Sequence, residues 1–347
     1  MTSPPRRRRG RQPSAPGAKL IAALASGLTT LAVIGLVFSA LGLVLYISPG
    51  PSRADKSPIT VVLRKGSGVA EIAGELQRAR VVANGPIFMA LAEISGAAHR
   101  IKPGEYAFPV GGSIAKVLEK LKSGDVVRHR ITIPEGASAA QARDILLRSD
   151  VLVGEAPEIE EGSILPETYE VLRGDSRASV VTRMSEAMDR TLGQLWDKRQ
   201  PNLPVHSPQE AIILASIVEK ETASDADRPK VAAVYINRLR QGMKLDADPT
   251  IIYGVTKGRP LGRGILASEL AADTPYNTYL HTGLPPTAIA NPSRASLAAV
   301  LDPPHTQDLY FVADGTGGAA FSATLEQHQR NVQRWREFEK ARAQLRH

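Results

Sequence analysis

The sequence predicts an α+β protein with a single N-terminal transmembrane helix, a small α+β module and a mainly helical domain that contains a short β-hairpin. Three observations support this. An uncharged apolar run covers residues 20–47. Short β-branched strands then alternate with helical periodicity up to about residue 135, and beyond that point most periodic segments are helical. Near the C-terminus, an Asp-Gly turn at 314–315 separates two short strand candidates.

The apolar run is longer than the about 20 residues that cross a bilayer, and longer than the roughly 7–15 apolar residues of a cleaved signal peptide. We therefore expect an uncleaved anchor at 20–47. The basic arm before it, residues 1–19, holds six basic residues and no acidic residue. It therefore accounts for six of the eight net positive charges. The positive-inside rule places this arm in the cytoplasm and the chain after residue 50 outside. Because the arm serves topology, we do not expect a nucleic-acid partner.

The composition excludes several classes of site. There is no cysteine, which removes disulfides and thiolate metal sites. The seven histidines never form a close pair with zinc spacing, and no H-E-x-x-H, P-loop or G-x-S-x-G motif occurs. We therefore expect neither a metal nor another cofactor.

A Pro/Gly-rich linker at 48–57 leads into the small module, which we place at 58–135. Its expected elements are, in order, a strand at 59–63, helices from Val69 and from about Pro86, a strand around 106–108, a helix between Ser113 and Gly124, and a strand at 126–133. The order of elements is typical of a binding module or of a spacer, and both interpretations stay open.

The mainly helical domain is placed at 136–347. We expect helices from the Ser138–Gln141 capping box, over about 178–198, from Ser207, from Asp225 or Asp227 to Gly242, from Asn291, and from Thr324 to the end, with a hairpin of strands at 309–313 and 319–322. Residues 161–169 are expected to form a loop. The stretch 243–292 has little periodicity, and irregular stretches of this length are usually functional.

The helix from Ser207 is the central element of this prediction. Ser207 and Glu210 form a capping-box pattern, and residues 211–218 are apolar except for Ser216, which indicates a buried helix. Glu219 and Glu221 follow at the C-terminal end, where apolar neighbours and the helix dipole both favour a protonated carboxyl. Such a carboxyl can act as a general acid. Pairing with an arginine, or a solvated helix end, would explain the same residues.

Polar and aromatic residues gather in the segments that should surround this helix. The tyrosines are Tyr169, Tyr235, Tyr253, Tyr276 and Tyr279, and the smaller polar residues are Asp246, Asp248, Thr250 and Asn277. An aromatic face with fixed hydrogen-bonding groups suits a ligand rich in hydroxyl and acetamido groups, such as a glycan. Any one tyrosine taken alone would more often be core packing.

Six blocks resemble the MltG (YceG-like) family in the family's order: LASIVEKET at 214–222, VYINRL at 234–239, DPTIIYG at 248–254, PYNTY at 275–279, GLPP at 283–286 and YFVADG at 310–315. The family consists of membrane-anchored endolytic murein transglycosylases of the bacterial inner membrane, often with a LysM-like module. The resemblance implies that Glu219 is the catalytic glutamate, with Glu221 the position to reconsider if the blocks align differently. Ser163 departs from the large apolar residue that relatives often carry.

The resemblance also implies a reaction without water, in which the C6 hydroxyl of MurNAc attacks its own C1 and leaves a 1,6-anhydro end. One carboxyl suffices because the nucleophile is tethered. Lower-ranked substrate contacts are Asn277, Tyr276, Tyr279, Thr250, Asp248, Tyr235 and Glu221. Peptidoglycan strands are the implied substrate and peptidoglycan synthases possible partners. The alternatives are a hydrolase with Asp246 or Asp248 as the base, and a non-catalytic glycan-binding scaffold.

Overall fold

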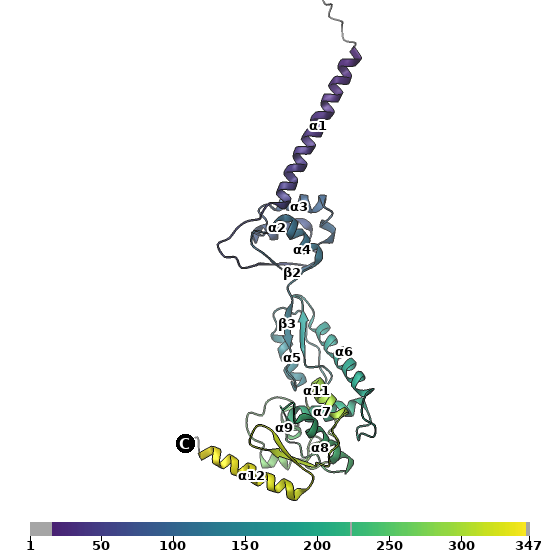
Figure 1. The fold of residues 1–347 in the computed structure, drawn as a ribbon, viewed down its shortest axis with the longest axis vertical. Helices are drawn as coiled ribbons and strands as arrows, with labels where there is room; N and C mark the ends of the chain where they lie inside the picture. The colour runs from purple at the N-terminus through teal and green to yellow at the C-terminus, as the bar shows by residue number, and fades with distance from the viewer. Residues whose placement is uncertain (1–15, 223, 345–347) are drawn as a thin grey trace, which may run out of the picture. The chain divides into compact units, whose positions relative to one another are not determined.

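The computed structural model describes residues 16–222 and 224–344 and divides the chain into two compact units, Met1–Val127 and Arg128–His347 (Figure 1). Residues 1–15 of the predicted basic arm lie outside the described residues. The boundary at 127/128 differs from the one that we placed after residue 135, and the pairing of one strand, given below, is the reason.

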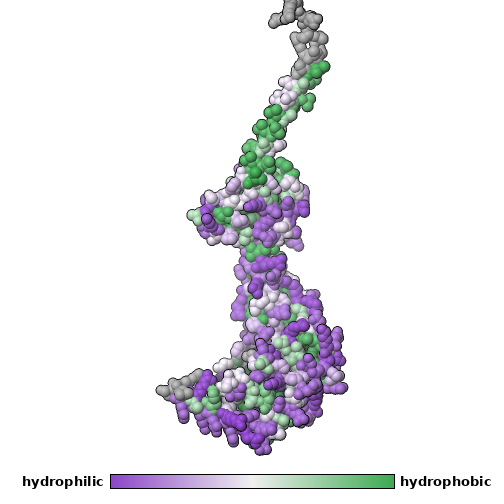
Figure 2. Space-filling view, in the orientation of Figure 1, coloured by the Kyte–Doolittle hydropathy of each residue, from purple (hydrophilic) through white to green (hydrophobic). Residues whose placement is uncertain are grey.

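The first unit begins with helix α1, Pro16–Ile47. Its segment Ala23–Ile47 is long and apolar enough to cross a membrane, and none of it is buried in the protein. Figure 2 shows apolar residues along its length. Large side chains such as Leu36, which is 72% exposed, would be unfavourable in water. The helix is therefore consistent with membrane anchoring.

The rest of the first unit confirms the predicted order of elements as far as the helix between Ser113 and Gly124, whereas the predicted last strand of the module belongs to the second unit. Strands β1 (Ile59–Leu63) and β2 (Gly104–Phe108) pair antiparallel, with Ile59 opposite Phe108. Helices α2 (Val69–Arg78), α3 (Gly85–Ile94) and α4 (Ile114–Ser123) and a 3₁₀ turn, η1 (Ala98–Arg100), complete it. The buried core includes Leu76, Phe88, Tyr106 and Leu118.

The second unit carries the remaining elements. In order they are β3 (His129–Thr132), α5 (Ala139–Arg148), β4 (Thr168–Val171), α6 (Arg177–Trp196), α7 (Pro208–Glu221), α8 (Arg228–Arg240), α9 (Asp248–Thr256), α10 (Ala267–Leu270), α11 (Arg294–Leu301), β5 (Tyr310–Ala313), β6 (Ala319–Ser322) and α12 (Leu325–Gln344). The predicted C-terminal hairpin is confirmed, since β5 and β6 pair antiparallel.

Four elements were not expected from the sequence: η1, β4, α9 and α10. Strand β4 occupies the end of the stretch that we expected to be a loop, and it pairs antiparallel with β3, Ile131 lying opposite Tyr169. This long-range pairing attaches β3 to the second unit. Helix α9 lies inside the stretch with little periodicity. Its Pro249 suits a first helical turn, and Lys257 closes it in the left-handed conformation at φ 52°.

Helix α7 lies at the centre of the second core, as predicted. Its residues 211–218 are all buried, and α7 contacts α8, α9 and α11. The Ser207 side chain accepts a hydrogen bond from the Glu210 amide at 3.1 Å. The Glu210 carboxylate accepts from the amide of His206 at 2.6 Å rather than from that of Ser207, so the cap differs from the predicted box by one residue. This rigid helix presents its C-terminal carboxylates to the site described next.

Candidate active site

A cavity of about 370 Å³ opens beside the C-terminal end of α7. Its described lining comes from α7, α8, the loop before α9, the loop after α10, β5 and the start of α12. The lining residues are Glu221, Tyr235, Arg238, Leu245, Asp246, Asp248, Tyr279, Tyr310, Phe311, Leu325 and His328. The volume lies at the small end of the range for ligand pockets, about 300–1,000 Å³.

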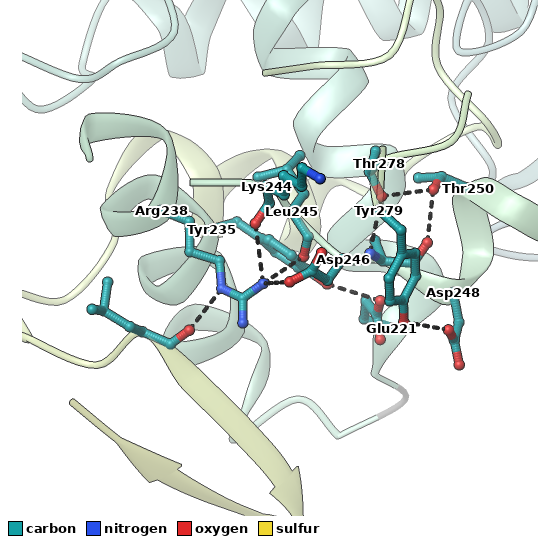
Figure 3. Close-up of polar contacts among 12 residues, drawn as sticks. Glu221, Tyr235, Arg238, Lys244, Leu245, Asp246, Asp248, Thr250, Thr278 and Tyr279 are labelled. Carbon is teal, nitrogen blue, oxygen red and sulfur yellow. Dashed lines mark hydrogen bonds and ion pairs between the residues drawn. The ribbon is translucent and has the colours of Figure 1, made fainter. Parts of the chain in front are cut away.

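Glu221 is one of the three carboxyl groups that line this cavity, and Figure 3 shows its contact with Tyr235. The hydroxyl of Tyr235, which is 1% exposed, donates to Glu221 Oε1 at 2.8 Å. Burial raises the pKa of Glu221 to about 7 and the charge of Asp248 adds to the rise, whereas the Tyr235 hydrogen bond and Arg238 lower that pKa. A substantial fraction of Glu221 therefore carries a proton near neutral pH, which is the state that a general acid needs.

Asp248 and Tyr279 form a second polar pair in the same cavity. The Tyr279 hydroxyl donates to Asp248 Oδ1 at 2.7 Å. Burial raises the pKa of Tyr279, and its hydrogen bond to Asp248 raises it further. The phenol therefore stays protonated and remains a donor. Asp248 lies at the N-terminal end of α9, where a negative charge is favourable.

Arg238 is a residue that sequence reasoning did not assign to the site. Its guanidinium donates to the carbonyl oxygens of Leu309 at 2.7 Å, Lys244 at 3.1 Å and Leu245 at 2.9 Å. It also donates to Asp246 Oδ2 at 3.0 Å. Asp246 has a left-handed backbone, φ 50°, and these bonds hold it there. The sequence feature that could have pointed to Arg238 is the presence of an arginine within the otherwise apolar stripe of α8.

Glu219 lies outside this cavity. Its Oε2 accepts hydrogen bonds from the Ser293 amide at 2.9 Å and from the Ser293 hydroxyl at 2.6 Å. Ser293 caps α11, so Glu219 links the end of α7 to the start of α11. Two residues along a helix turn the side chain by about 200°, which explains why Glu219 and Glu221 face different surroundings.

Asn277 and Thr250 lie close to the site, but their side-chain polar atoms are already hydrogen-bonded within the protein. Asn277 is 1% exposed, and its amide nitrogen donates to the carbonyls of Leu270 at 2.9 Å and Ala272 at 2.7 Å. Its oxygen accepts from the amide of Tyr279 at 2.9 Å. Thr250 is fully buried, and its hydroxyl donates to Ala247 at 2.7 Å. Both residues hold the loops that carry Asp248 and Tyr279.

The five predicted tyrosines separate into three groups. Only Tyr235 and Tyr279 line the cavity with Glu221. Tyr253 and Tyr276 pack on each other with ring centroids 5.0 Å apart, and the Tyr276 hydroxyl lies 2.8 Å from that of Thr287. Tyr169 packs in a separate core, where its hydroxyl donates to the carbonyl of Leu165 at 2.6 Å.

A second buried carboxyl, Glu161, was also missed by sequence reasoning. It accepts a hydrogen bond from the Ala139 amide at 2.7 Å and another from Tyr253. Burial raises the pKa of Glu161 to about 7 against these hydrogen bonds. Across residues 16–222 and 224–344, no group of three His, Cys, Asp or Glu side chains is arranged to hold a metal ion.

Comparison with known proteins agrees with this arrangement of helices and polar loops. The model of the YceG-like family matches residues 61–334, which is most of the chain. This chain belongs to the YceG-like family. The match includes every residue of the Glu221 cavity and, in the first unit, the chain from within β1 to the end of α4.

Named relatives extend the comparison. The endolytic murein transglycosylase of Bacillus subtilis (strain 168) is 27% identical over 315 residues, which cover 82% of this chain and 86% of that protein. The endolytic murein transglycosylase of Streptococcus pneumoniae serotype 2 (strain D39 / NCTC 7466) is 30% identical over 327 residues, covering 80% of this chain and 58% of the relative. The crystal structure of a putative YceG-like protein from Listeria monocytogenes aligns with a TM-score of 0.50 at 27% identity, covering 80% of this chain and 99% of that one.

Proposed function

We propose that this YceG-like protein is an endolytic lytic transglycosylase that cleaves the MurNAc–GlcNAc bond of peptidoglycan strands, and that Glu221 is its acid–base group. The observation that carries the proposal is the partly buried Glu221 carboxyl, which has a pKa of about 7 and faces a cavity lined by tyrosines and carboxylates. Relatives named endolytic murein transglycosylase supply the reaction class.

Glu221 suits the acid–base role better than Glu219, the residue that the motif resemblance favoured. Both hydrogen bonds that Glu219 accepts come from Ser293 and hold a helix cap, and Glu219 does not line the cavity. Each glutamate has one carboxylate oxygen without a hydrogen bond to a described residue, Oε2 in Glu221 and Oε1 in Glu219, but only Glu221 lines the cavity where a substrate could reach that oxygen. A group that must exchange a proton with substrate needs that freedom.

In the proposed reaction, Glu221 donates its proton to the glycosidic oxygen as the bond to C1 of MurNAc breaks. The C6 hydroxyl of the same sugar bonds to C1, and its proton returns to Glu221. Products are a 1,6-anhydro-MurNAc end and a free C4 hydroxyl on GlcNAc, and no water is consumed. The tethered nucleophile has a large effective concentration, so a second carboxylate to activate water is not required.

A hydrolase is the second candidate, because two further carboxylates, Asp246 and Asp248, line the same cavity. An inverting hydrolase uses a second carboxylate to activate water. Asp246 accepts a hydrogen bond from Arg238, and Asp248 accepts one from Tyr279. In the transglycosylase we assign Asp248 and Tyr279 to sugar binding. A non-catalytic glycan-binding scaffold is the alternative without any turnover.

The first unit is proposed to set the position of the enzyme. Its apolar helix α1 would anchor the chain in the inner membrane, with the basic arm in the cytoplasm and the domain at 136–347 on the outer side. The module at 58–135 is proposed to be LysM-like and to act either as a glycan-binding module or as a spacer. Cleavage close to the membrane would trim nascent strands next to peptidoglycan synthases.

The test uses the full chain in detergent with uncrosslinked glycan strands, comparing wild type with Glu221→Gln and Glu219→Gln. Loss of general acid–base catalysis costs about 10²–10⁴-fold in rate. We expect a loss of this size for Glu221→Gln and most of the activity to remain in Glu219→Gln. If only Glu219→Gln were inactive while folded, the acid–base role would belong to Glu219.

A further inference from the structure

A cationic donor group in the cavity beside Glu221 makes no hydrogen bond to the residues that the structure describes. Arg238 is 9% exposed, and Nε and Nη1 make all four of its hydrogen bonds. The second amino nitrogen, Nη2, bonds to no described residue, and Figure 3 shows it pointing away from Asp246. Nη2 is not among the fully buried side-chain atoms without a hydrogen-bond partner, so it is accessible to solvent. Because Arg238 lines the cavity, Nη2 is placed to bind a ligand oxygen there.

The guanidinium is held rigidly for such a role. Its four hydrogen bonds fix the plane, and its central carbon lies 5.3 Å from the centroid of the Tyr310 ring. The His328 ring stacks on Tyr310 with centroids 5.2 Å apart and an interplanar angle of 23°. Burial lowers the pKa of His328, and the charge of Arg238 lowers it further. His328 is therefore neutral at pH 7, and Arg238 is the one cation among the described lining residues.

The charges around Arg238 limit what it can bind. Asp246 lies 3.0 Å from Nη1 and neutralises much of the positive charge. Asp248 and Glu221 line the same cavity. A fully charged anion would meet these carboxylates, whereas a carbonyl oxygen accepts from Nη2 without that repulsion. The free donors therefore favour a carbonyl group more than a free anion.

The two alternating sugars of peptidoglycan differ at C3. MurNAc carries an ether-linked lactyl group there, whose carbonyl is an amide in peptide-bearing strands and a carboxylate in peptide-free strands. GlcNAc carries only a hydroxyl. C3 lies two bonds from C1 in the ring, so a group that reads the C3 substituent has to lie beside the catalytic carboxyl rather than at it. Arg238 and Glu221 have this relation, as separate residues lining one small cavity.

We infer that Arg238 Nη2 binds the lactyl carbonyl oxygen of MurNAc and so decides which of the two sugars occupies the cavity beside Glu221. The inference rests on the proposed function and adds a specificity-determining residue to it. Tyr310 acts as a positioning residue, because its ring lies against the guanidinium and holds the orientation of the guanidinium plane. Cleavage then follows MurNAc and not GlcNAc, because only MurNAc carries a carbonyl group on its C3 substituent.

The test measures binding without turnover, in the full chain carrying Glu221→Gln. Three ligands of equal length are titrated calorimetrically: a GlcNAc oligomer, a peptide-free strand and a peptide-bearing strand. A hydrogen bond to a charged group corresponds to about a tenfold or larger change in Kd. We expect the GlcNAc oligomer to bind at least about tenfold more weakly than a MurNAc ligand. Because the carboxylates of the cavity repel an anion, we expect the peptide-bearing strand, whose lactyl carbonyl is an amide, to bind more tightly than the peptide-free strand.

Adding Arg238→Gln should weaken MurNAc binding about tenfold, to the level of the GlcNAc oligomer, and leave the GlcNAc oligomer unchanged. Arg240→Gln is the matched control, because Arg240 is exposed on the same helix and does not line the cavity. If Arg238→Gln lowers the Tm markedly, Tyr310→Leu replaces it, since that change leaves the guanidinium hydrogen bonds in place and should reduce the same discrimination.

Equal binding of GlcNAc and MurNAc ligands by a chain whose wild type cleaves strands would overturn the role of Arg238 and leave the proposed function standing. An equal loss for all three ligands in Arg238→Gln would overturn it too. Absence of both binding and cleavage in the wild type would contradict the proposed function itself.

Discussion

Removing the Tyr235 hydroxyl should shift the pH dependence of cleavage in a direction that the structure fixes. The hydroxyl donates to Glu221 Oε1 at 2.8 Å and lowers the pKa of Glu221, against the rise to about 7 caused mainly by burial. Tyr235→Phe keeps the ring in the core and deletes only this bond. Glu221 must therefore hold its proton to a higher pH in the variant.

The size of the shift follows from the bond. A hydrogen bond to an ionised group contributes about 1.5–3 kcal/mol, and one to a neutral group about half as much. The difference is about 1–1.5 kcal/mol, which corresponds to about one pKa unit. In the variant, the alkaline limb of kcat, measured from pH 5 to 10, should therefore move from about 7 to about 8. Tyr169→Phe, which deletes a hydroxyl bond outside the cavity, should leave the limb in place. An unchanged limb in Tyr235→Phe, or a shift to lower pH, would refute Glu221 as the titrating acid.

Two further predictions concern stability. The pKa of Glu161 is about 7 in the folded chain against 4.5 for the free side chain, so its contribution to stability is complete below about pH 4.5 and is lost as pH rises through 7. Glu161→Gln should remove this loss, so urea unfolding should show the variant gaining stability relative to wild type between pH 5 and pH 8, and an equal difference at both values would contradict it. Ser293→Ala removes the hydroxyl that caps α11 and that donates to Glu219, whereas the amide of residue 293 can still donate to Glu219. The variant should lower the free energy of unfolding by about 1–3 kcal/mol while largely preserving kcat; a large loss of kcat in a stable Ser293→Ala protein would point back to Glu219 as the catalytic group.

Local signals in the sequence were sufficient for much of the fold. The apolar run at 20–47 gave α1, and the eight residues at 211–218 gave the buried α7, because their burial is encoded in their own side chains. Caps at Ser113, Ser138 and Ser293 mark helix starts through short-range hydrogen bonds.

Long-range features could not be read in the same way. Strand β4 exists because residues 168–171 pair with β3, and neither segment alone shows where its partner lies. Helix α9 has apolar residues in sequence without a repeating polar face, so its periodicity is weak.

The sequence also could not decide which of Glu219 and Glu221 faces the cavity. Both follow the same apolar run, and the difference between them arises from Ser293 on α11 and Tyr235 on α8. The arginine at 238 showed only as a basic residue in a buried stripe, because its partners are backbone carbonyls, which the sequence does not distinguish. The sequence did indicate a region with residues suited to glycan binding. It could not show that the five tyrosines separate into three groups, because that depends on tertiary contacts.

Mass spectrometry of the products tests the central claim most directly. The full chain in detergent is incubated with uncrosslinked glycan strands, with Glu221→Gln in parallel. We predict ends that are lighter by one water than hydrolytic ends, formed by wild type and absent with Glu221→Gln. Ordinary reducing ends from the wild type would contradict the transglycosylase reaction and direct attention to Asp246 or Asp248, whereas full activity in Glu221→Gln would contradict the assignment of the acid.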